Sequence, residues 1–182
     1  MGKSWTGLRK ELEEEFLCES LRGRVQYFLT HYHGAPDNYG RFCVRVDKNE
    51  YAMANPYAYY VKGYSNLEYS MKQELDIPER EWTDEGYLYD NENKAIEDEV
   101  VNISINNGDF DIYNITDAIR EYKELPIVKS IVSKNPIVRM FAVMDRRIGK
   151  RTLDKLAKEV DRQPKWLQFF YKLRLDSENI DY

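Results

Sequence analysis

The chain has 182 residues, of which 42% are hydrophobic and 32% charged, and its formal net charge at pH 7 is −5. These values are typical of a globular protein with a sizeable core and exclude a disordered chain. The negative net charge also argues against nonspecific binding to nucleic acid, which is a polyanion.

The charge is unevenly distributed along the sequence. Residues 120–174 contain 15 Lys or Arg and 6 Asp or Glu, whereas residues 76–99 contain 10 acidic residues against Arg80 and Lys94. This segregation predicts either two parts of the chain that attract each other or two faces offered to different partners. The 15 tyrosines slightly favour a binding surface, because each combines a large contact area with a polar tip, and the alternative is that many are half-buried sheet residues.

The first predicted element is an amphipathic helix over residues 5–21. Its apolar side chains recur at helical spacing, and Gly23 can end it. Cys18 falls inside this helix, so we expect an inert, buried thiol at that position. The apolar positions of the helix are Trp5, Leu8, Leu12, Phe16, Leu17 and Leu21.

An antiparallel meander is predicted to follow the helix. From Arg24 the pattern changes to the alternation of a half-buried strand, and residues 34–40 then favour a turn because they contain Gly, Pro, Asp and Asn. A second strand is predicted over 41–47. A tight turn at 47–49 leads into a third strand at 50–54.

The middle of the chain has weaker patterns. Apolar residues at helical spacing between Leu67 and Leu75 predict a helix that ends near Asp76. The acidic segment 79–93 is weakly patterned, and we interpret it as an exposed loop. Residues 95–105 fit a strand by alternation and a helix by spacing, and we favour the helix.

A series of helices is predicted for the C-terminal part. Asn114 or Thr116 can cap the first of them, and Pro126 begins a short second one. Asn135 caps the third, in which apolar residues cover most faces. Pro164 begins the last helix, whose aromatic stripe we assign to the core.

The most apolar of these helices starts at Asn135 and is predicted to reach Gly149, where a left-handed residue can end it. Arg146 and Arg147 would then lie in its last turn, against the negative end of the helix dipole. Thr152 can cap the helix that follows.

Arg139 interrupts the apolar surface of this central helix. A buried and unpaired charge would be strongly destabilising, so we expect a buried carboxylate beside the guanidinium group. The candidate partners are Glu11, Glu15 and Glu19 of the first helix.

Together these elements predict an α+β fold, in which a small antiparallel sheet with an N-terminal helix is followed by a C-terminal helical part. We expect a single domain over 1–182. Its parts would be the helix, meander and helix at 1–78, the acidic loop at 79–93 and the helical part at 94–182.

The densest positive charge lies at the predicted end of the central helix. Its Arg and Lys side chains could bind a phosphate or an acidic partner surface, because the arginine fork matches planar anions. The alternative is that they are solvated helix ends with small stabilising effects. The candidate binding residues of this region are Arg139, Asp145, Arg146, Arg147, Lys150 and Arg151.

The sequence contains no catalytic signature or cofactor motif that we recognise, and we expect no cofactor. His31 and His33 would share one face of the first strand, but a closed zinc site needs four ligands, so we expect no metal. Cys18 and Cys43 form no CxxC pair, which favours a reducing, cytoplasmic location. No apolar run is long enough to span a membrane.

Three segments of the sequence resemble a family of small bacterial proteins. They are WTGLRKELEEEFLCESLRGRVQYF at the start, NPIVRMFAVMDRRIGKRTL in the centre and QPKWLQFFYKLRLDSE near the end. The central and terminal segments are fairly specific, and the central one contains a DRRxGKRTL-type motif. The resemblance extends over most of the chain and implies a soluble bacterial cytosolic protein. It implies no activity, substrate, cofactor or site residue, because that family has no assigned function.

The function that these features favour is non-catalytic protein binding, for example by a bacterial accessory or toxin-neutralising protein. The acidic, Tyr-rich stretch 51–99 would be the face for a basic partner. The alternative is nucleic-acid binding through the basic C-terminal helices, whose side chains could contact phosphates. A third class, an enzyme with an unfamiliar site, is left open because the sequence does not show which polar residues converge.

Overall fold

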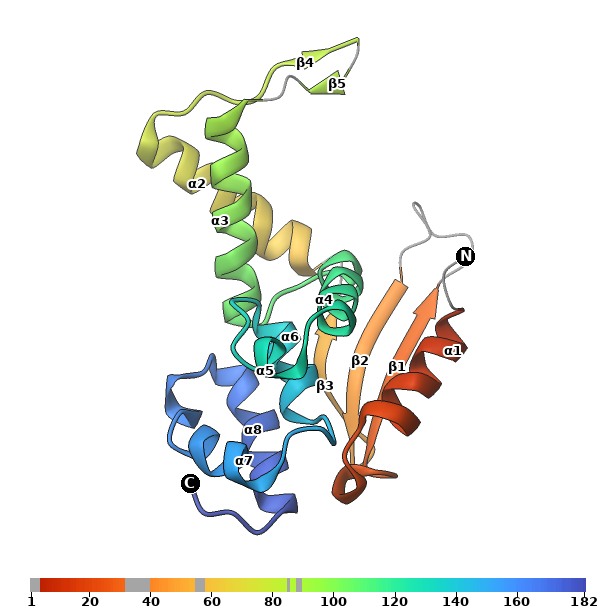
Figure 1. The fold of residues 1–182 in the computed structure, drawn as a ribbon. Helices are drawn as coiled ribbons and strands as arrows, with labels where there is room; N and C mark the ends of the chain where they lie inside the picture. The colour runs from red at the N-terminus through yellow and green to blue at the C-terminus, as the bar shows by residue number, and fades with distance from the viewer. Residues whose placement is uncertain (1–3, 32–39, 55–57, 85, 88–89) are drawn as a thin grey trace.

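The computed structural model describes residues 4–31, 40–54, 58–84, 86–87 and 90–182. It confirms the predicted α+β fold, with an N-terminal helix, a three-stranded antiparallel sheet and a C-terminal helical part (Figure 1).

The strands are β1 (Val25–His31), β2 (Gly40–Val46) and β3 (Asn49–Ala54), with a separate hairpin of β4 (Trp82–Thr83) and β5 (Gly86–Tyr87). The α-helices are α1 (Trp5–Lys10), α2 (Ser65–Leu75), α3 (Asn91–Asn107), α4 (Ile112–Glu124), α5 (Ile127–Ser130), α6 (Pro136–Val143), α7 (Lys150–Ala157) and α8 (Lys165–Ser177). Two π-helices, η1 (Glu11–Phe16) and η4 (Ala58–Tyr64), and two 3-10 helices, η2 (Glu19–Leu21) and η5 (Val160–Arg162), complete the elements.

One face of the β1–β2–β3 sheet packs against helices and forms the core. The Phe141 ring of α6 lies 5.5 Å from the Tyr27 ring of β1 and 6.4 Å from the Phe42 ring of β2. On β3, Tyr51 stacks on Phe169 of α8 with the ring centroids 4.0 Å apart. These aromatic contacts join the sheet to the C-terminal helices through a single apolar core.

The other face of the sheet carries charged side chains beside the apolar Phe28, Cys43 and Met53. The Arg45 guanidinium lies 4.2 Å from the centroid of the Phe28 ring and donates a 2.9 Å hydrogen bond to Glu50. The predicted tight turn between β2 and β3 is confirmed. It has positive φ at Asp47 (49°) and Lys48 (73°), which is the geometry of the two-residue hairpin turn that matches strand twist.

The first helix is shorter than the sequence predicts. α1 continues into η1, and this helical path ends at Phe16, because Leu17 and Cys18 pair with the chain around Asp145 instead. The prediction that Cys18 lies inside the helix is therefore wrong, although its thiol is buried as expected. A Glu13 carboxylate oxygen accepts a 2.7 Å hydrogen bond from the N–H of β1 residue Tyr27, so η1 covers this edge of the sheet.

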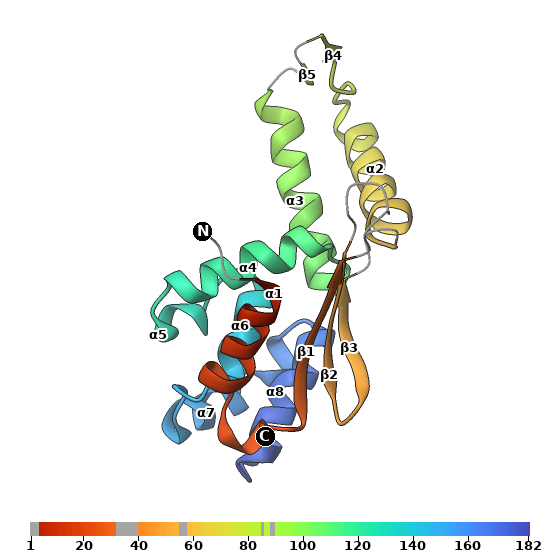
Figure 2. The same ribbon diagram turned by 90° about the vertical axis from the view of Figure 1, so that its right-hand side faces the viewer.

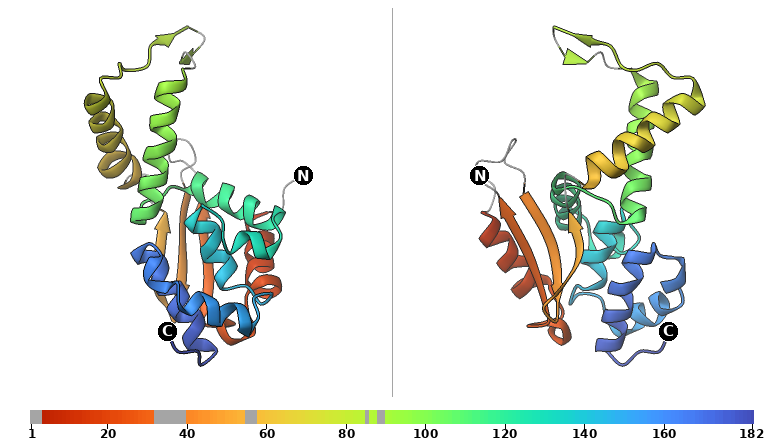
Figure 3. Two further views of the ribbon diagram at one scale, coloured as in Figure 1. Left: turned by 60° about the vertical axis from the view of Figure 1, so that its left-hand side comes forward. Right: turned by 180° about the vertical axis from the view of Figure 1, so that it is seen from behind.

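A helical arm, which we define as η4, α2, the β4–β5 hairpin and α3, projects from the body (Figures 1 and 3). The helix favoured for 95–105 is confirmed by α3, and the helix predicted to end near Asp76 is confirmed by α2. The segment 79–93, predicted as a loop, contains the β4–β5 hairpin and the first residues of α3.

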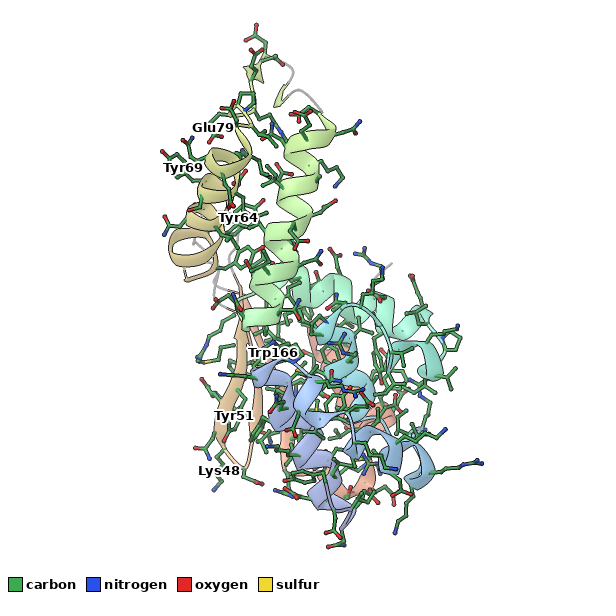
Figure 4. All side chains as sticks on the ribbon, turned by 90° about the vertical axis from the view of Figure 1, so that its left-hand side faces the viewer. Lys48, Tyr51, Tyr64, Tyr69, Glu79 and Trp166 are labelled. Carbon is green, nitrogen blue, oxygen red and sulfur yellow. The ribbon has the colours of Figure 1, made fainter. Side chains whose placement is uncertain are left out.

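The arm joins the body where α3 ends at Gly108, which has a left-handed φ of 91°. The indole N–H of Trp166, at the start of α8, donates a 2.8 Å hydrogen bond to the Ile105 carbonyl oxygen (Figure 4). The Tyr60 hydroxyl of η4 donates a 2.9 Å hydrogen bond to Asp111. The first and last segments of the arm, η4 and α3, are therefore both hydrogen-bonded to the body at the base of the arm.

The C-terminal helices begin close to the predicted positions. α4 is capped by Asp111, three residues before the predicted cap Asn114, because the Asp111 carboxylate and the Asn114 amide form a reciprocal capping box. α5 and α8 follow Pro126 and Pro164 as predicted. The aromatic stripe of α8 packs against the core, which confirms its assignment.

Candidate functional site

Three chain segments that are far apart in sequence meet on the body. The Cys18 N–H donates a 2.9 Å hydrogen bond to the Met144 carbonyl oxygen, and the Arg146 N–H donates one of 2.8 Å to the Phe16 carbonyl oxygen. These bonds pair the residues after η1 with the turn after α6 as a short antiparallel bridge. We name the meeting place the junction, and it comprises residues 16–22, 144–151 and 174–178.

Asp145 is the centre of the junction and is fully buried. Its carboxylate accepts hydrogen bonds from the Tyr122 hydroxyl of α4 and from Arg147, at 2.7 Å from the backbone N–H and 2.5 Å from Nη2. The Arg147 guanidinium also lies 4.9 Å from the centroid of the Phe16 ring. A buried carboxylate is tolerated only with such complete pairing.

This pairing also affects the titration of the groups around Asp145. Burial, reinforced by the negative charge of Asp145, raises the pKa of the Tyr122 hydroxyl. The hydrogen bonds to Asp145 raise the pKa of the Arg147 guanidinium. Both groups are held in the protonated form that donates to Asp145, so we interpret the trio as a structural clamp that fixes α4 to the junction.

The central helix does not reach Gly149 as predicted. α6 ends at Val143, and Gly149 is the N-cap of α7 with a φ of −85°, not a left-handed helix end. The prediction that Thr152 caps α7 is wrong for the same reason. Arg146 and Arg147 lie in the turn after α6, and Arg147 donates hydrogen bonds to the buried Asp145 carboxylate in that turn.

Arg174 of α8 holds the third segment of the junction. Its side chain is only 4% exposed, and it donates hydrogen bonds to Glu178, to the Ser20 hydroxyl at 3.2 Å and to the Ile148 carbonyl oxygen at 3.3 Å. The Ser20 hydroxyl also donates to Glu178 at 2.9 Å. The hydrogen bonds from Arg174 hold the pKa of Glu178 below its ordinary value.

The lowered pKa of Glu178 predicts a pH-dependent stability. A carboxyl group with a depressed folded-state pKa stabilises the fold above its unfolded-state pKa of about 4.3, and this contribution is lost as the pH falls through the folded-state value. Urea unfolding of the parent and of Glu178→Gln at several pH values should show curves that converge on acidification below that range. Glu74→Gln, on an exposed face of α2, is the control and should keep the parent's pH dependence.

The carboxylate expected beside Arg139 is not there, and that prediction is wrong. Among the described residues, the Arg139 guanidinium donates to the Ser133 carbonyl oxygen at 2.5 Å, to that of Lys134 at 3.0 Å and to the Gln163 side chain at 3.1 Å. Burial lowers the pKa of this guanidinium. Arg139 therefore ties the loop before α6 to the turn before α8. Of the three proposed partners, Glu11 pairs with Lys123 and Glu19 with Arg22, and no pairing of Glu15 with Arg139 is found.

Arg139→Met should therefore cost about 1–2 kcal/mol of unfolding free energy, less than the roughly 3–5 kcal/mol of a broken buried ion pair. The reason is that half-buried carbonyl oxygens can bind water once the guanidinium is gone. Urea unfolding measures the difference. Lys150→Ala and Arg151→Ala are matched controls that should stay within about 0.5 kcal/mol of the parent. A loss as large as that of an ion pair would contradict this account.

The six candidate binding residues thus divide into two groups. Arg139, Asp145 and Arg147 bind other parts of the chain. The other three have exposed side chains that form no hydrogen bond or ion pair with the part of the chain that the structure describes. These exposed residues are Arg146, Lys150 and Arg151.

A second candidate site lies on the arm, in a groove between the outer halves of α2 and α3. Its cavity volume is about 670 Å³. The floor of the groove is apolar. The Leu75 side chain is 58% exposed there, because nothing in the described chain covers it. Acidic side chains form the rim. The groove is lined by Met71, Leu75, Asp76, Ile77, Glu92, Ala95, Ile96 and Glu99.

The part of the arm from α2 to α3 has an acidic excess that is not neutralised within it. Residues 65–107 contain twelve acidic and three basic residues. Each basic residue is already paired with arm carboxylates: Lys72 with Glu68 and Glu79, Arg80 with Glu97, and Lys94 with Asp98. The three rim acids Asp76, Glu92 and Glu99 make no ion pair with any described residue. Figure 4 shows Tyr69 and Glu79 on the same projecting part.

The sequence predicted the acidic face but not the groove. Two helices with apolar positions, separated by a short acidic segment, are the signal of a helical hairpin, and interpreting 79–93 as a loop hid it. His31 and His33 lie outside the residues whose side chains the structure describes. In the part that it does describe, no cluster of three or more His, Cys, Asp or Glu could hold a metal ion.

The fold and these two sites define a small α+β protein with a clamped junction and an acidic helical arm. The model of the SF0329 protein family matches residues 4–175, and the chain belongs to this family. No curated protein and no solved structure matches the chain. Within the described residues, no helix has both the length and the apolar character needed to cross a membrane.

Proposed function

We propose that this chain is a non-catalytic protein-binding protein whose arm binds a basic segment of a partner. The observation that supports the proposal best is the groove between α2 and α3, which is lined by exposed apolar side chains and by carboxylates that form no ion pair with any described residue. Exposed apolar surface with a charged rim is typical of a protein–protein contact.

The chemistry of the groove defines the partner segment. An apolar floor between two helices suits an amphipathic helix, whose apolar stripe it would cover. The rim acids Asp76, Glu92 and Glu99 favour Lys or Arg beside that stripe, because opposite charges speed association and exclude other partners. A bacterial accessory protein of the cytoplasm, such as one that neutralises a basic toxin, fits this description.

The proposal is tested by comparing two variants that add the same charge at different exposed apolar positions. Leu75→Lys places a cation in the groove, whereas Met53→Lys, 50% exposed on β3, is the matched control. Affinity capture from the host, followed by mass spectrometry, should return one stoichiometric partner with the parent and with Met53→Lys. Leu75→Lys should lose it. The captured partner should contain a basic amphipathic segment that binds as a synthetic peptide, more weakly at high salt.

Two results would contradict the proposal. The first is that the parent captures no stoichiometric partner. The second is that Leu75→Lys captures the same partner as the parent, which would place the contact elsewhere on the surface.

A second proposal, nucleic-acid binding, has one observation in its favour: the exposed side chains of Arg146, Lys150 and Arg151 have no partner among the described residues. The net charge of −5 opposes it. Measuring the affinity for DNA and RNA at two salt concentrations tests this alternative, because each phosphate contact adds about 1 to the slope of log affinity against log salt concentration. Replacing the three residues by alanine should reduce that slope by about 3. Salt-independent or absent binding would remove this alternative.

A further inference from the structure

The most exposed large apolar side chains of the described residues lie on α5 and the turn after it. Val128 is 66% exposed and Val132 69%. The Ile131 N–H bonds to the Ile127 carbonyl oxygen, so the turn continues the helix and places the two valines on one face. Exposed lysines flank them. We name Val128, Lys129, Val132 and Lys134 the α5 knob.

The α5 knob and the arm groove are complementary in charge, and both expose apolar side chains. The knob presents two strongly exposed valines beside two cations, and the groove presents an apolar surface beside three acids that form no ion pair with any described residue. Burying both sets of apolar side chains together would remove the two strongly exposed valines from water. The opposite charges would meet at the edge of the contact.

A single chain cannot make this contact with itself. The groove lies on the outer half of the arm, and α5 follows the end of α4 that points away from the arm (Figure 2). The 13 residues of α4 alone span about 20 Å, and the half of α3 below the groove adds to this separation. A contact between a knob and a groove therefore requires two molecules.

We propose that the groove is occupied by the α5 knob of a second copy of this chain, in a reciprocal dimer. A two-fold axis lets each copy insert its knob into the groove of the other, so both contacts form and the assembly closes without growing into a filament. The two contacts support each other, because the second forms within an existing complex. The dimer regulates binding at the groove, because the knob covers the groove and a partner segment must displace it.

This inference rests on the groove of the proposed function but not on the identity of any partner. The first experiment measures the mass of the full chain by light scattering and analytical ultracentrifugation. At low salt the mass should approach twice the 21.7 kDa of one chain, and it should fall towards one chain at about 0.5 M salt, where charges are screened beyond about 4 Å. Val132→Asp should give a monomer. Tyr113→Asp, 56% exposed on α4, adds the same charge elsewhere and should still dimerise.

A charge-reversal experiment separates a specific contact from a change in folding. One variant reverses the rim with Glu92→Lys and Glu99→Lys, and the other reverses the knob with Lys129→Glu and Lys134→Glu. Each alone brings like charges together and should be monomeric. Mixed in equal amounts they should dimerise, because each rim then faces a knob of opposite charge in both contacts. All these positions are exposed, and circular dichroism checks that the fold is unchanged.

The outcomes are distinct from those of the proposed function. A parent that is monomeric up to about 1 mM, or variants that dimerise as the parent does, would overturn the dimer, because a weaker contact has no practical affinity. If that monomer still loses its partner on Leu75→Lys, the dimer is excluded and the protein-binding function stands. A dimer that captures no partner supports the inference and removes the proposed function.

Discussion

Replacing Asp145 with alanine should lower the unfolding free energy by about 3–5 kcal/mol, the usual cost of removing one member of a buried ion pair. Three donors lose their acceptor: the Tyr122 hydroxyl and the N–H and guanidinium groups of Arg147. The Tyr122 side chain is buried and cannot turn to water, whereas Arg147 is 40% exposed, so the lower end of the range is expected. For a chain of this length the melting temperature should fall by roughly 6–12 °C.

Two neighbouring variants test the explanation. Asp145→Asn keeps an acceptor oxygen but removes the charge. Its unfolding free energy should fall by less than that of the alanine variant. Arg146→Ala changes the adjacent exposed residue and should stay within about 0.5 kcal/mol of the parent. Urea unfolding gives all three values. If Asp145→Ala were as stable as Arg146→Ala, the clamp would not hold the junction together.

Gly108→Ala should destabilise the fold by about 2–4 kcal/mol. Its φ of 91° disfavours any residue with a Cβ atom. A Cβ atom there would also lie 3.1 Å from Cδ1 of Trp166, whose indole is held by a hydrogen bond to Ile105 and by contact with the Phe110 ring. The substitution must therefore strain the base of the arm or push Trp166 away.

Gly23→Ala is the control for this prediction. Gly23 has a similar φ of 80°, but an added Cβ atom would meet no other atom within 4 Å. Its cost should be the conformational term alone, about 1–2 kcal/mol. The difference between the two variants, measured by urea unfolding, isolates the contact with Trp166. Equal costs would show that Trp166 yields freely and does not fix the arm.

Sequence patterns were sufficient to predict local structure wherever one period dominated. The alternation in 24–54 predicted the meander, and the apolar spacing of α8 predicted a helix that the structure confirms. The weaker spacing in α2 and the ambiguous pattern in α3 also favoured helices, and the structure confirms both. These signals are local, because they depend on which residues share one face of a helix or strand. The charge segregation was also visible in the sequence, and it predicted the acidic face of the arm.

The ends of the helices and the pairing of the charges depend on contacts between distant segments of the chain. The first helix stops at Phe16 and α6 at Val143 because residues from both ends of the chain pair at the junction, and no local pattern reports such a contact. The same holds for the six candidate site residues. Asp145 is buried and pairs with Arg147, and Arg139 donates to carbonyl oxygens, whereas Arg146, Lys150 and Arg151 are exposed to solvent. A charged side chain is stabilised by the partners around it in space, and sequence spacing does not specify those partners.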